Sequence, residues 1–452
     1  MFALLFSLAI LPILPTLKKI LDRKDVNIFD ITLLFSEMYF WAIPVKDFLV
    51  NHVHPEYVYH DETAIAVCLY MYGLAILALI FSRMKNSPLL VTKWLGKLNT
   101  IEVKNSFQWF ALIYIAYMLF QITNYAALDD ENFEGNNNFF YGENANIIMK
   151  LILVPFRDFF PAIFIVLWTN KPKDNFYSKL RFVNLLLMLV SLLLGSKGFM
   201  MFNFVFLALY LYAHNRTKLS RKKILFYAAA IICTLSLVFP ISQSFRYYKQ
   251  DVVRNTSNHS FITVAKGFLE DGISTDLQKR VDDYEKGRSL NIYDATDFAA
   301  ARTNFQGYGY MSWIIFKYVI PQRMGSDGNI MAVLMLGGGD VGESTLAWFV
   351  LDYGYIIGPI VAVLYFLFLY SLYYYFGMFF YRWVKNPVYQ LVIYTIILRI
   401  AVGIERNPST DIKALYNTYY LIIIFVWVIL AYYSKKPKYK IRYNNDRKVF
   451  EN

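Results

Sequence analysis

Long apolar runs alternate with shorter polar loops along most of the chain. A run of roughly 17 to 25 apolar residues can cross a bilayer as a helix, and about eleven runs approach that length. They centre on residues 2–16, 29–50, 62–82, 106–126, 147–169, 181–196, 198–213, 223–241, 353–380, 387–404 and 416–433. This pattern predicts an all-α polytopic membrane protein with about eleven transmembrane helices.

Lysine and arginine are concentrated in alternate loops. The basic loops are LKKILDRK, RMKNSPLLVTKWLGKLNTIEVK, NKPKDNFYSKLR, HNRTKLSRKK, YRWVKN and the tail KKPKYKIRYNNDRK, whereas NHVHPEYVYHDE and ALDDENFEGNNNFFYGEN contain neither residue. Because basic loops stay in the cytoplasm, this bias predicts an outer N-terminus and a cytoplasmic C-terminus. The first run lacks a basic start and an A-x-A-like cleavage site, so we interpret it as an uncleaved span.

The spans fall into two groups on either side of a long polar segment. Residues 1–241 form a predicted N-terminal bundle of about eight spans, and residues 353–433 form a C-terminal bundle of about three. Residues 242–352 are too polar to span and, by parity, form one large, partly helical outer loop. A basic cytoplasmic tail follows at residues 434–452.

The composition agrees with a membrane protein. Of the 452 residues, 57% are hydrophobic and 19% are aromatic, which exceeds the content of an ordinary soluble domain. The formal net charge of +12 could reflect nucleic-acid binding, but its concentration in loops favours a membrane protein without a nucleic-acid partner. The two cysteines lie in apolar runs and the five histidines lack metal-ligand spacing, so neither a metal nor a cofactor is expected.

Charged residues within or beside the spans are candidate functional residues, because a charge in hydrocarbon is costly. Arg157 and Asp158 lie between two prolines in VPFRDFFPA, where an interrupted helix could hold a structural brace or a ligand site. Lys197 lies at the outer hairpin tip LLLGSKGFMM, where snorkelling to the interface is the alternative explanation. Arg246 follows a span in FPISQSFRYYK, either as an interface anchor or as a ligand-binding residue.

Arg399 and Arg406 form the pair that most favours ligand binding. They are seven residues apart in IILRIAVGIERNPSTDIK, about two helical turns, so they share a face if the helix continues. One could pair with Glu405 or Asp411, which leaves the other for an anion. The candidate cations thus gather at the outer interface. Because arginine binds phosphate bidentately, a lipid diphosphate is the favoured ligand.

The segment GGGDVGEST at residues 337–345 nearly matches a phosphate-binding loop, but Glu343 occupies the position that requires lysine. No nucleotide is therefore expected there. On the outer side before the span at 353–380, the glycines could bring the backbone close to a ligand and Glu343 could act as a general base. The alternative is a simple helix start, with Ser344 or Thr345 as the cap and Glu343 near the helix N-terminus.

The order of these features resembles the Wzy-type O-antigen and capsule polymerases, multi-span proteins that extend lipid-linked glycans outside the cytoplasmic membrane. The similar pieces, from about residue 147 onward, are RDFFPAIFIVL, LLLGSKGFMMFNF, FRYYK, YVIPQR, GESTLAWFVLDYGYIIGP and GIERNPSTD. The chain departs from the family in having Lys197 where arginine is usual. It also lacks the spaced arginine and glycine pattern that some members have in their outer loops.

The resemblance implies a metal-independent glycosyltransferase of the multi-span lipid-phospho-sugar type in the bacterial cytoplasmic (inner) membrane. Undecaprenyl-diphosphate-linked oligosaccharides would be donor and acceptor, with membrane lipid and a chain-length regulator protein as further partners. Glu343, Arg246 and Arg406 would be catalytic. The diphosphate would be bound by Lys197, Arg246, Arg302, Arg323, Arg399, Arg406 and Arg157, and the sugars by Asp340, Ser344, Tyr308, Tyr310 and Trp313.

Two other functions are compatible with the sequence. A ligase would move finished glycan to a lipid-A core or another acceptor and would need a histidine near the reacting hydroxyl, for which His259 is the candidate. A flippase for the same lipid-linked sugar would be expected to show repeat symmetry and charges at mid-membrane. The predicted charges concentrate at the outer interface instead, which favours chemistry on one side of the membrane.

Overall fold

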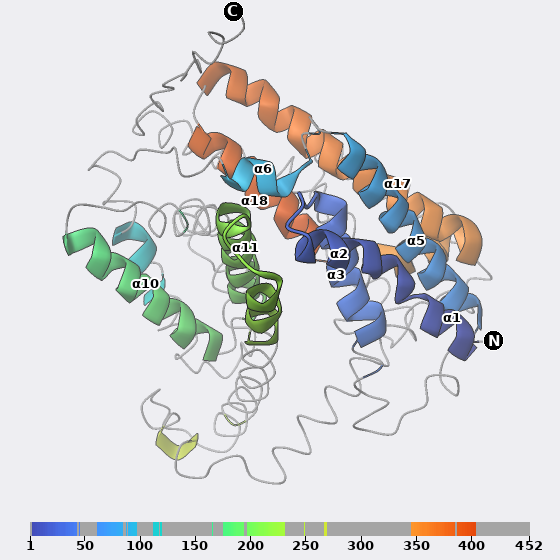
Figure 1. Ribbon diagram of the computed structural model, residues 1–452, viewed down its shortest axis with the longest axis horizontal. Helices are drawn as coiled ribbons and strands as arrows, with labels where there is room; N and C mark the ends of the chain where they lie inside the picture. Colours follow the sequence, from blue (N-terminus) through green and yellow to red (C-terminus); the bar gives the residue numbers. More distant parts are fainter. Residues whose placement is uncertain are drawn as a thin grey trace, which may run out of the picture.

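The computed structural model describes the main helices of both predicted bundles. The described residues are 2–42, 61–84, 89–96, 175–193, 197–230, 345–384 and 387–403, with short pieces at 45, 87, 112–116, 118–119, 165, 248 and 266–268. Within these ranges the chain forms helices, turns and short connections, with no strand. Figure 1 shows these residues as coloured ribbons. The predicted all-α class is confirmed for the described part of the chain.

The N-terminal helices are α1 (Phe2–Leu8), a 3-10 turn η1 (Leu11–Ile13), α2 (Leu14–Leu21), α3 (Ile28–Glu37), a π-helix η2 (Met38–Ala42), α5 (Asp61–Arg83) and α6 (Val91–Gly96). The later helices are α10 (Asn175–Leu193), α11 (Lys197–Asn215), α17 (Thr345–Val384) and α18 (Pro387–Val402). A further helical stretch covers residues 221–230.

Three described helical segments are long and apolar enough to cross a membrane. They are Leu4–Leu21, Asp61–Arg83 and Asp352–Phe379. They correspond to the predicted spans at 2–16, 62–82 and 353–380, and they indicate a membrane protein. Helices also cover the predicted runs at 181–196, 198–213 and 387–404, while the run at 416–433 and the predicted outer loop lie almost wholly outside the described residues.

The first predicted span is not one continuous helix. The structure divides it into α1, η1 and α2, with Pro12 inside the 3-10 turn and Pro15 in the first turn of α2. Proline has no backbone N–H and its ring clashes with the preceding helical turn, so each proline favours a break or a helix start. The predicted first span is therefore an interrupted helix, and it is still long and apolar enough to cross a membrane.

The core of the bundle lies between α3, α5 and α17. Phe29 of α3 packs against both Phe81 of α5 and Tyr370 of α17, with ring centroids 5.1 and 5.3 Å apart. Thr32 and Tyr370 are joined by a hydrogen bond of 2.6 Å between their hydroxyl groups. Earlier along the same two helices, Gly73 lies against Val363, so α5 and α17 run side by side in the same direction (Figure 1).

The other helices pack around this core. α18 contacts both α17 and α3, and α11 contacts both α6 and α18 (Figure 1). α10 and α11 follow each other in the chain and contact each other, and the tip of the predicted hairpin at 194–196 lies outside the described residues. These contacts bring helices from both predicted bundles into one assembly.

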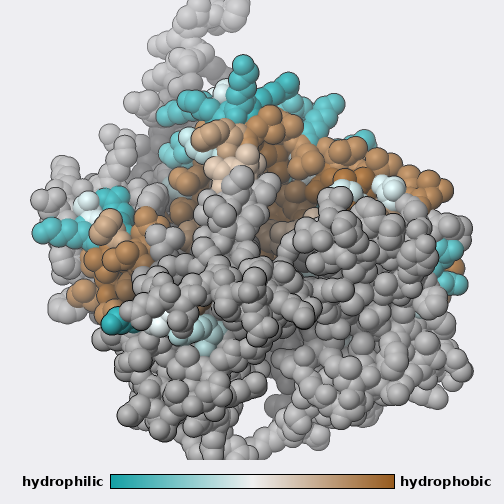
Figure 2. All heavy atoms as spheres, turned by 90° about the horizontal axis from the view of Figure 1, so that it is seen from below, coloured by the Kyte–Doolittle hydropathy of each residue, from teal (hydrophilic) through white to brown (hydrophobic). Residues whose placement is uncertain are grey.

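The described helices present a broad apolar surface. On α5, the exposed side chains Leu69, Tyr72, Ile76, Leu79 and Ile80 recur at helical spacing. On α17 the corresponding exposed side chains are Ile356, Ile357, Ile360, Leu364 and Phe368. Figure 2 shows apolar residues as a wide brown area bordered by hydrophilic residues in teal. A stripe of this kind on a long apolar helix fits contact with lipid.

Candidate functional site

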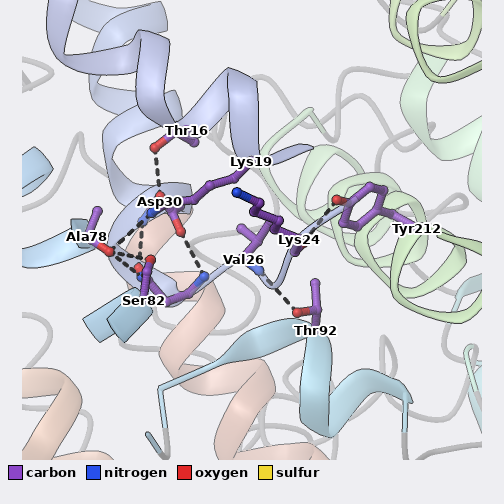
Figure 3. A network of polar contacts seen from close by, with 10 residues as sticks. Thr16, Lys19, Lys24, Val26, Asp30, Ala78, Ser82, Thr92 and Tyr212 are labelled. Atoms are coloured by element: carbon purple, nitrogen blue, oxygen red, sulfur yellow. Dashed lines mark hydrogen bonds and ion pairs between the residues drawn. The ribbon is translucent and has the colours of Figure 1, made fainter. Parts of the chain in front are cut away.

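A buried ion pair joins α2 to α3. Asp30 is fully buried, and its Oδ1 accepts hydrogen bonds of 2.7 Å from both Lys19 Nζ and Thr16 Oγ1 (Figure 3). Lys19 also donates to the carbonyl oxygen of Ala78 near the end of α5, at 3.1 Å. A buried charge pair is tolerated when its remaining polar atoms are also hydrogen bonded, as they are here.

The start of α3 is capped by a reciprocal pair of side chains. Asn27 accepts from the backbone N–H of Asp30 at 3.0 Å, and Asp30 Oδ2 accepts from the backbone N–H of Asn27 at 2.9 Å. The Asn27 amide also donates to Ala78 O and to Ser82 Oγ at the end of α5. Because every group in this cluster has a partner, we interpret it as a structural brace.

A second set of contacts joins the α2–α3 connection to α6 and α11. Asp25 Oδ1 accepts from the guanidinium of Arg216 and, at 2.7 Å, from Thr92 Oγ1. Tyr212 donates to the carbonyl oxygens of Ile20 and Lys24, both at 3.1 Å. Residues from LKKILDRK and HNRTKLSRKK, which the charge pattern predicts to lie on the same side, therefore lie next to each other.

These contacts define one end of the bundle, which we call the basic end. It contains the ends of α2, α5 and α11, together with Lys18, Lys19, Arg23, Lys24, Arg83, Lys93, Arg216, Lys218, Arg221, Lys222 and Lys223. The opposite end, where α5 begins with Asp61 and Glu62, is called the far end. Because α17 runs in the same direction as α5, α17 also proceeds from the far end toward the basic end.

The first part of α17 is folded back on the rest of the helix. Gly354 interrupts the helix with φ 77° and ψ 176°, a backbone conformation that glycine adopts readily and other residues do not. The rings of Phe349 and Tyr365 lie 5.1 Å apart, although a continuous helix would separate these residues by about 24 Å. Residues 345–353 therefore form a separate short helix, which we call the folded-back helix.

The folded-back helix lies within the bundle. Thr345, Leu346, Ala347, Trp348, Phe349 and Val350 are all buried, and Trp348 is among the largest fully buried side chains. The folded-back helix lies very close to the main part of α17, because a Cβ at Gly358 would come within 2.5 Å of the carbonyl oxygen of Phe349. Thr345, the residue that directly follows GGGDVGES, is thus already buried in the bundle.

Two of the predicted diphosphate-binding residues fall on described backbone. Lys197 is the first residue of α11, at the opposite end of that helix from the basic end. Arg399 lies in the last turn of α18, half-buried, and its carbonyl oxygen accepts from Gly403 N–H at 2.9 Å. α18 returns alongside the last part of α17, with Ile393 next to Gly377, so Arg399 lies near the level of Tyr370, which packs on Phe29 beside the basic end. Lys197 therefore lies away from the basic end, and Arg399 lies close to it.

The other predicted site residues lie outside the described residues. They are Arg157, Arg246, Arg302, Tyr308, Tyr310, Trp313, Arg323, Asp340, Glu343, Ser344 and Arg406. Their predicted roles stay predictions. Among the described residues, no group of three or more histidine, cysteine or acidic side chains could hold a metal ion.

Glu37 is a buried carboxylate that the sequence argument missed. It is the last residue of α3 and is 5% exposed, and neither of its carboxylate oxygens has a hydrogen-bond partner in the structure. Its carboxylate interacts electrostatically with the thiol of Cys68, which in turn donates to Leu5 O of α1. An acid near the middle of the apolar run at 29–50 was the sequence signal that could have found it.

Comparisons with known protein families, with curated protein sequences and with solved structures find no match for this chain.

Proposed function

We propose that this protein polymerises undecaprenyl-diphosphate-linked oligosaccharide repeat units at the outer face of the bacterial cytoplasmic membrane. In the proposed reaction, a base takes the proton of an acceptor hydroxyl on a newly arrived unit, and that oxygen attacks the anomeric carbon of the growing glycan. The bond between that carbon and the lipid diphosphate breaks, and the diphosphate leaves with the electron pair. The product would be O-antigen or capsular polysaccharide.

The proposed topology has about eleven spans with the N-terminus outside and the C-terminus inside. Its support is the convergence of basic loops at one end of the bundle, through the pairs of Asp25 with Arg216 and of Asp22 with Arg221. Lysine and arginine in short loops favour the cytoplasmic side. The basic end is accordingly the proposed cytoplasmic end, and the far end is the proposed outer end.

The observation that carries the proposal is the folded-back helix. Its first residue, Thr345, is 1% exposed, so the chain that follows Glu343 and Ser344 enters the bundle at once. A helix that returns alongside its own span is tolerated in a membrane when it is covered by protein, as residues 345–350 are. This arrangement supports a role for Glu343 as a base beside the membrane-embedded donor lipid.

The proposed diphosphate site uses cations near the outer end. Lys197 supports it by its position at the end of α11 away from the basic end. Arg399 does not support it, because it lies near the basic end. Arg246 and Arg406 are the proposed catalytic cations, because a fixed guanidinium stabilises the negative charge that develops on a leaving diphosphate. The remaining proposed contacts are Arg157, Arg302 and Arg323 to the diphosphate and Asp340, Ser344, Tyr308, Tyr310 and Trp313 to sugars.

A purified protein assay tests the proposal directly. Full-length protein in lipid nanodiscs is mixed with lipid-diphosphate repeat units isolated from the host, and the products are separated by length. We expect a ladder of longer lipid-linked glycans. A protein that only moves lipids across the membrane would leave the units unchanged, and a ligase would leave glycan length unchanged while joining it to another acceptor.

Glu343→Gln tests the proposed base. The amide has nearly the same size but cannot take the acceptor proton, so we expect a correctly inserted protein that no longer extends the glycan. In cells, single repeat units should then appear on the surface. A polymer of normal length from this variant would remove Glu343 from the mechanism. Arg246→Ala is expected to give the same phenotype, and a normal ladder would show that Arg246 is only an interface anchor.

A further inference from the structure

Two carboxylates on the same helix have opposite surroundings. Asp30 and Glu37 are seven residues apart in α3, which is about two turns and puts them on one face. Asp30 is paired with Lys19 and Thr16 of α2. Glu37 is buried to a similar degree, yet the structure gives neither of its oxygens a hydrogen-bond partner. The same helix face thus carries one compensated and one uncompensated acid.

The surroundings of Glu37 come from three helical segments. α5 contributes Cys68, whose thiol is bonded to Leu5 O of α1. One turn after Glu37, Trp41 stacks on Phe6 of α1 with ring centroids 6.1 Å apart. The indole N–H of Trp41 is also buried without a hydrogen-bond partner. An unsatisfied hydrogen-bond acceptor and an unsatisfied donor therefore lie one turn apart, next to side chains that contact α1.

The backbone next to Glu37 is irregular. The π-helix Met38–Ala42 starts directly after it and includes Trp41. Short π-helical segments are rare and occur frequently at functional sites. Their presence beside an uncompensated acid is a second observation that indicates a site.

The titratable groups on the packed elements do not neutralise Glu37. α1 has the sequence FALLFSL and contains no charged side chain. α5 offers Cys68 and Tyr70, and the Tyr70 hydroxyl is hydrogen bonded to Ser36. α17 offers Tyr370, which is hydrogen bonded to Thr32, and α18, which packs against α3, carries Arg399 and Tyr394. Within the described chain no cation forms an ion pair with Glu37. A charge left alone in such a place is far more costly than a neutral carboxyl group.

We propose that Glu37 is a proton-binding site inside the membrane bundle, linked to the packing of α1 against α5 and Trp41. With its proton, the carboxyl group is neutral and α1 stays packed. Loss of the proton leaves a charge that is stabilised only when water reaches it, which requires α1 to move away. Because the neutral form is favoured when α1 is packed, proton binding favours the packed position of α1, and packing of α1 favours proton binding. This proposal is independent of the polymerase activity.

Infrared spectroscopy of the full-length protein in nanodiscs tests the protonated state. The wild-type spectrum minus the Glu37→Gln spectrum should contain the carbonyl stretch of a protonated carboxyl group at neutral pH. The matched control is Asp30→Asn, whose difference spectrum should contain only the bands of an ionised carboxylate, because Asp30 is paired with Lys19. A carboxylate band from Glu37 at neutral pH would overturn the proposal.

Labelling with dicyclohexylcarbodiimide gives an independent readout. The carboxyl proton moves to a nitrogen of this apolar reagent, the carboxyl oxygen adds to its central carbon, and rearrangement gives an N-acylurea with no atom lost. Mass spectrometry should find the adduct on Glu37 and not on Asp30, and Glu37→Gln should abolish it. Labelling should fall about tenfold for each pH unit above the midpoint of the Glu37 titration. Labelling that does not change with pH would contradict proton binding at this residue.

The link to α1 is tested at Cys68, whose thiol lies under Leu5. In the wild type, raising the pH should increase alkylation of Cys68 by N-ethylmaleimide more steeply than ionisation of the thiol alone explains. In Glu37→Gln, only the thiol's own ionisation should contribute. Identical pH profiles in the two proteins would show that protonation of Glu37 does not control the position of α1.

Discussion

The carbonyl oxygen of Phe349 lies where a side chain at Gly358 would have to be. A Cβ built at Gly358 would come within 2.5 Å of that oxygen and within 2.7 Å of the Cα of Val350. Both neighbours are backbone atoms, which cannot rotate away as a side chain can. Gly358 is therefore the position that lets the folded-back helix lie against the main part of α17.

Gly358→Ala should displace the folded-back helix. The added methyl group requires the backbone at Phe349 and Val350 to shift, and overpacking of this kind costs typically about 1–3 kcal/mol. If residues 345–353 position the proposed catalytic loop, glycan extension should fall more strongly than thermal stability. The measurements are the length distribution in the polymerisation assay and the unfolding midpoint in detergent.

Gly96→Ala is the control for this substitution. A Cβ at Gly96, in α6, would meet nothing within 4 Å. Both changes add one methyl group to a helix, and alanine is the better helix former in each case. We expect a small effect of Gly96→Ala on both readouts. Equal losses in the two variants would show that the contact at Phe349 has no special role.

The reversal of the chain at Gly354 could not be predicted from the sequence. The pattern from 353 onward predicts a span, and STLAWF predicts a helix start, and both are confirmed as helix. The sequence alone does not decide whether the two segments continue or reverse, because glycine allows a positive φ without requiring it. The decision depends on the packing of Phe349 against Tyr365 and of its carbonyl against Gly358, which are tertiary contacts.

At the basic end, too, the loops could be predicted from the sequence but their packing could not. The loop LKKILDRK is predictable as a basic loop, and the Asn27 and Asp30 spacing is a recognisable helix start. The burial of Lys19 is not predictable from a loop pattern, since its ammonium group is removed from water only by contact with Asp30 and with Ala78 of a distant helix. The predicted catalytic residues Arg246, Glu343 and Arg406 all lie outside the described residues, so their placement stays a prediction.

Lys19→Met should destabilise the N-terminal part of the bundle. The change keeps the length of the side chain but leaves Asp30 buried without its cation, and breaking a buried pair in this way costs about 3–5 kcal/mol. The unfolding midpoint in detergent measures the effect. Adding Asp30→Asn to Lys19→Met removes the uncompensated charge and should recover part of the loss.

Arg221→Ala is the control for the buried pair. The Arg221 side chain is 69% exposed in its contact with Asp22, so the pair is largely screened by solvent. Exposed pairs contribute about 0–1 kcal/mol, so the midpoint should change little. If Arg221→Ala were as damaging as Lys19→Met, burial of the ion pair would not be the reason for the stability of this end.

The orientation of the bundle can be tested with cysteines at its two ends. Lys218 is exposed in the turn after α11 at the basic end, and Glu62 is exposed at the start of α5 at the far end. In a Cys68→Ala, Cys233→Ala background, a maleimide that cannot cross membranes should label Glu62→Cys in intact spheroplasts. It should label Lys218→Cys only after the membrane is opened, because basic loops stay in the cytoplasm. The reverse pattern would place the far end inside the cell, and the proposed outer site of lipid-linked polymerisation would then be wrong. Labelling of both positions in intact spheroplasts would mean that the two ends do not lie on opposite sides of a membrane.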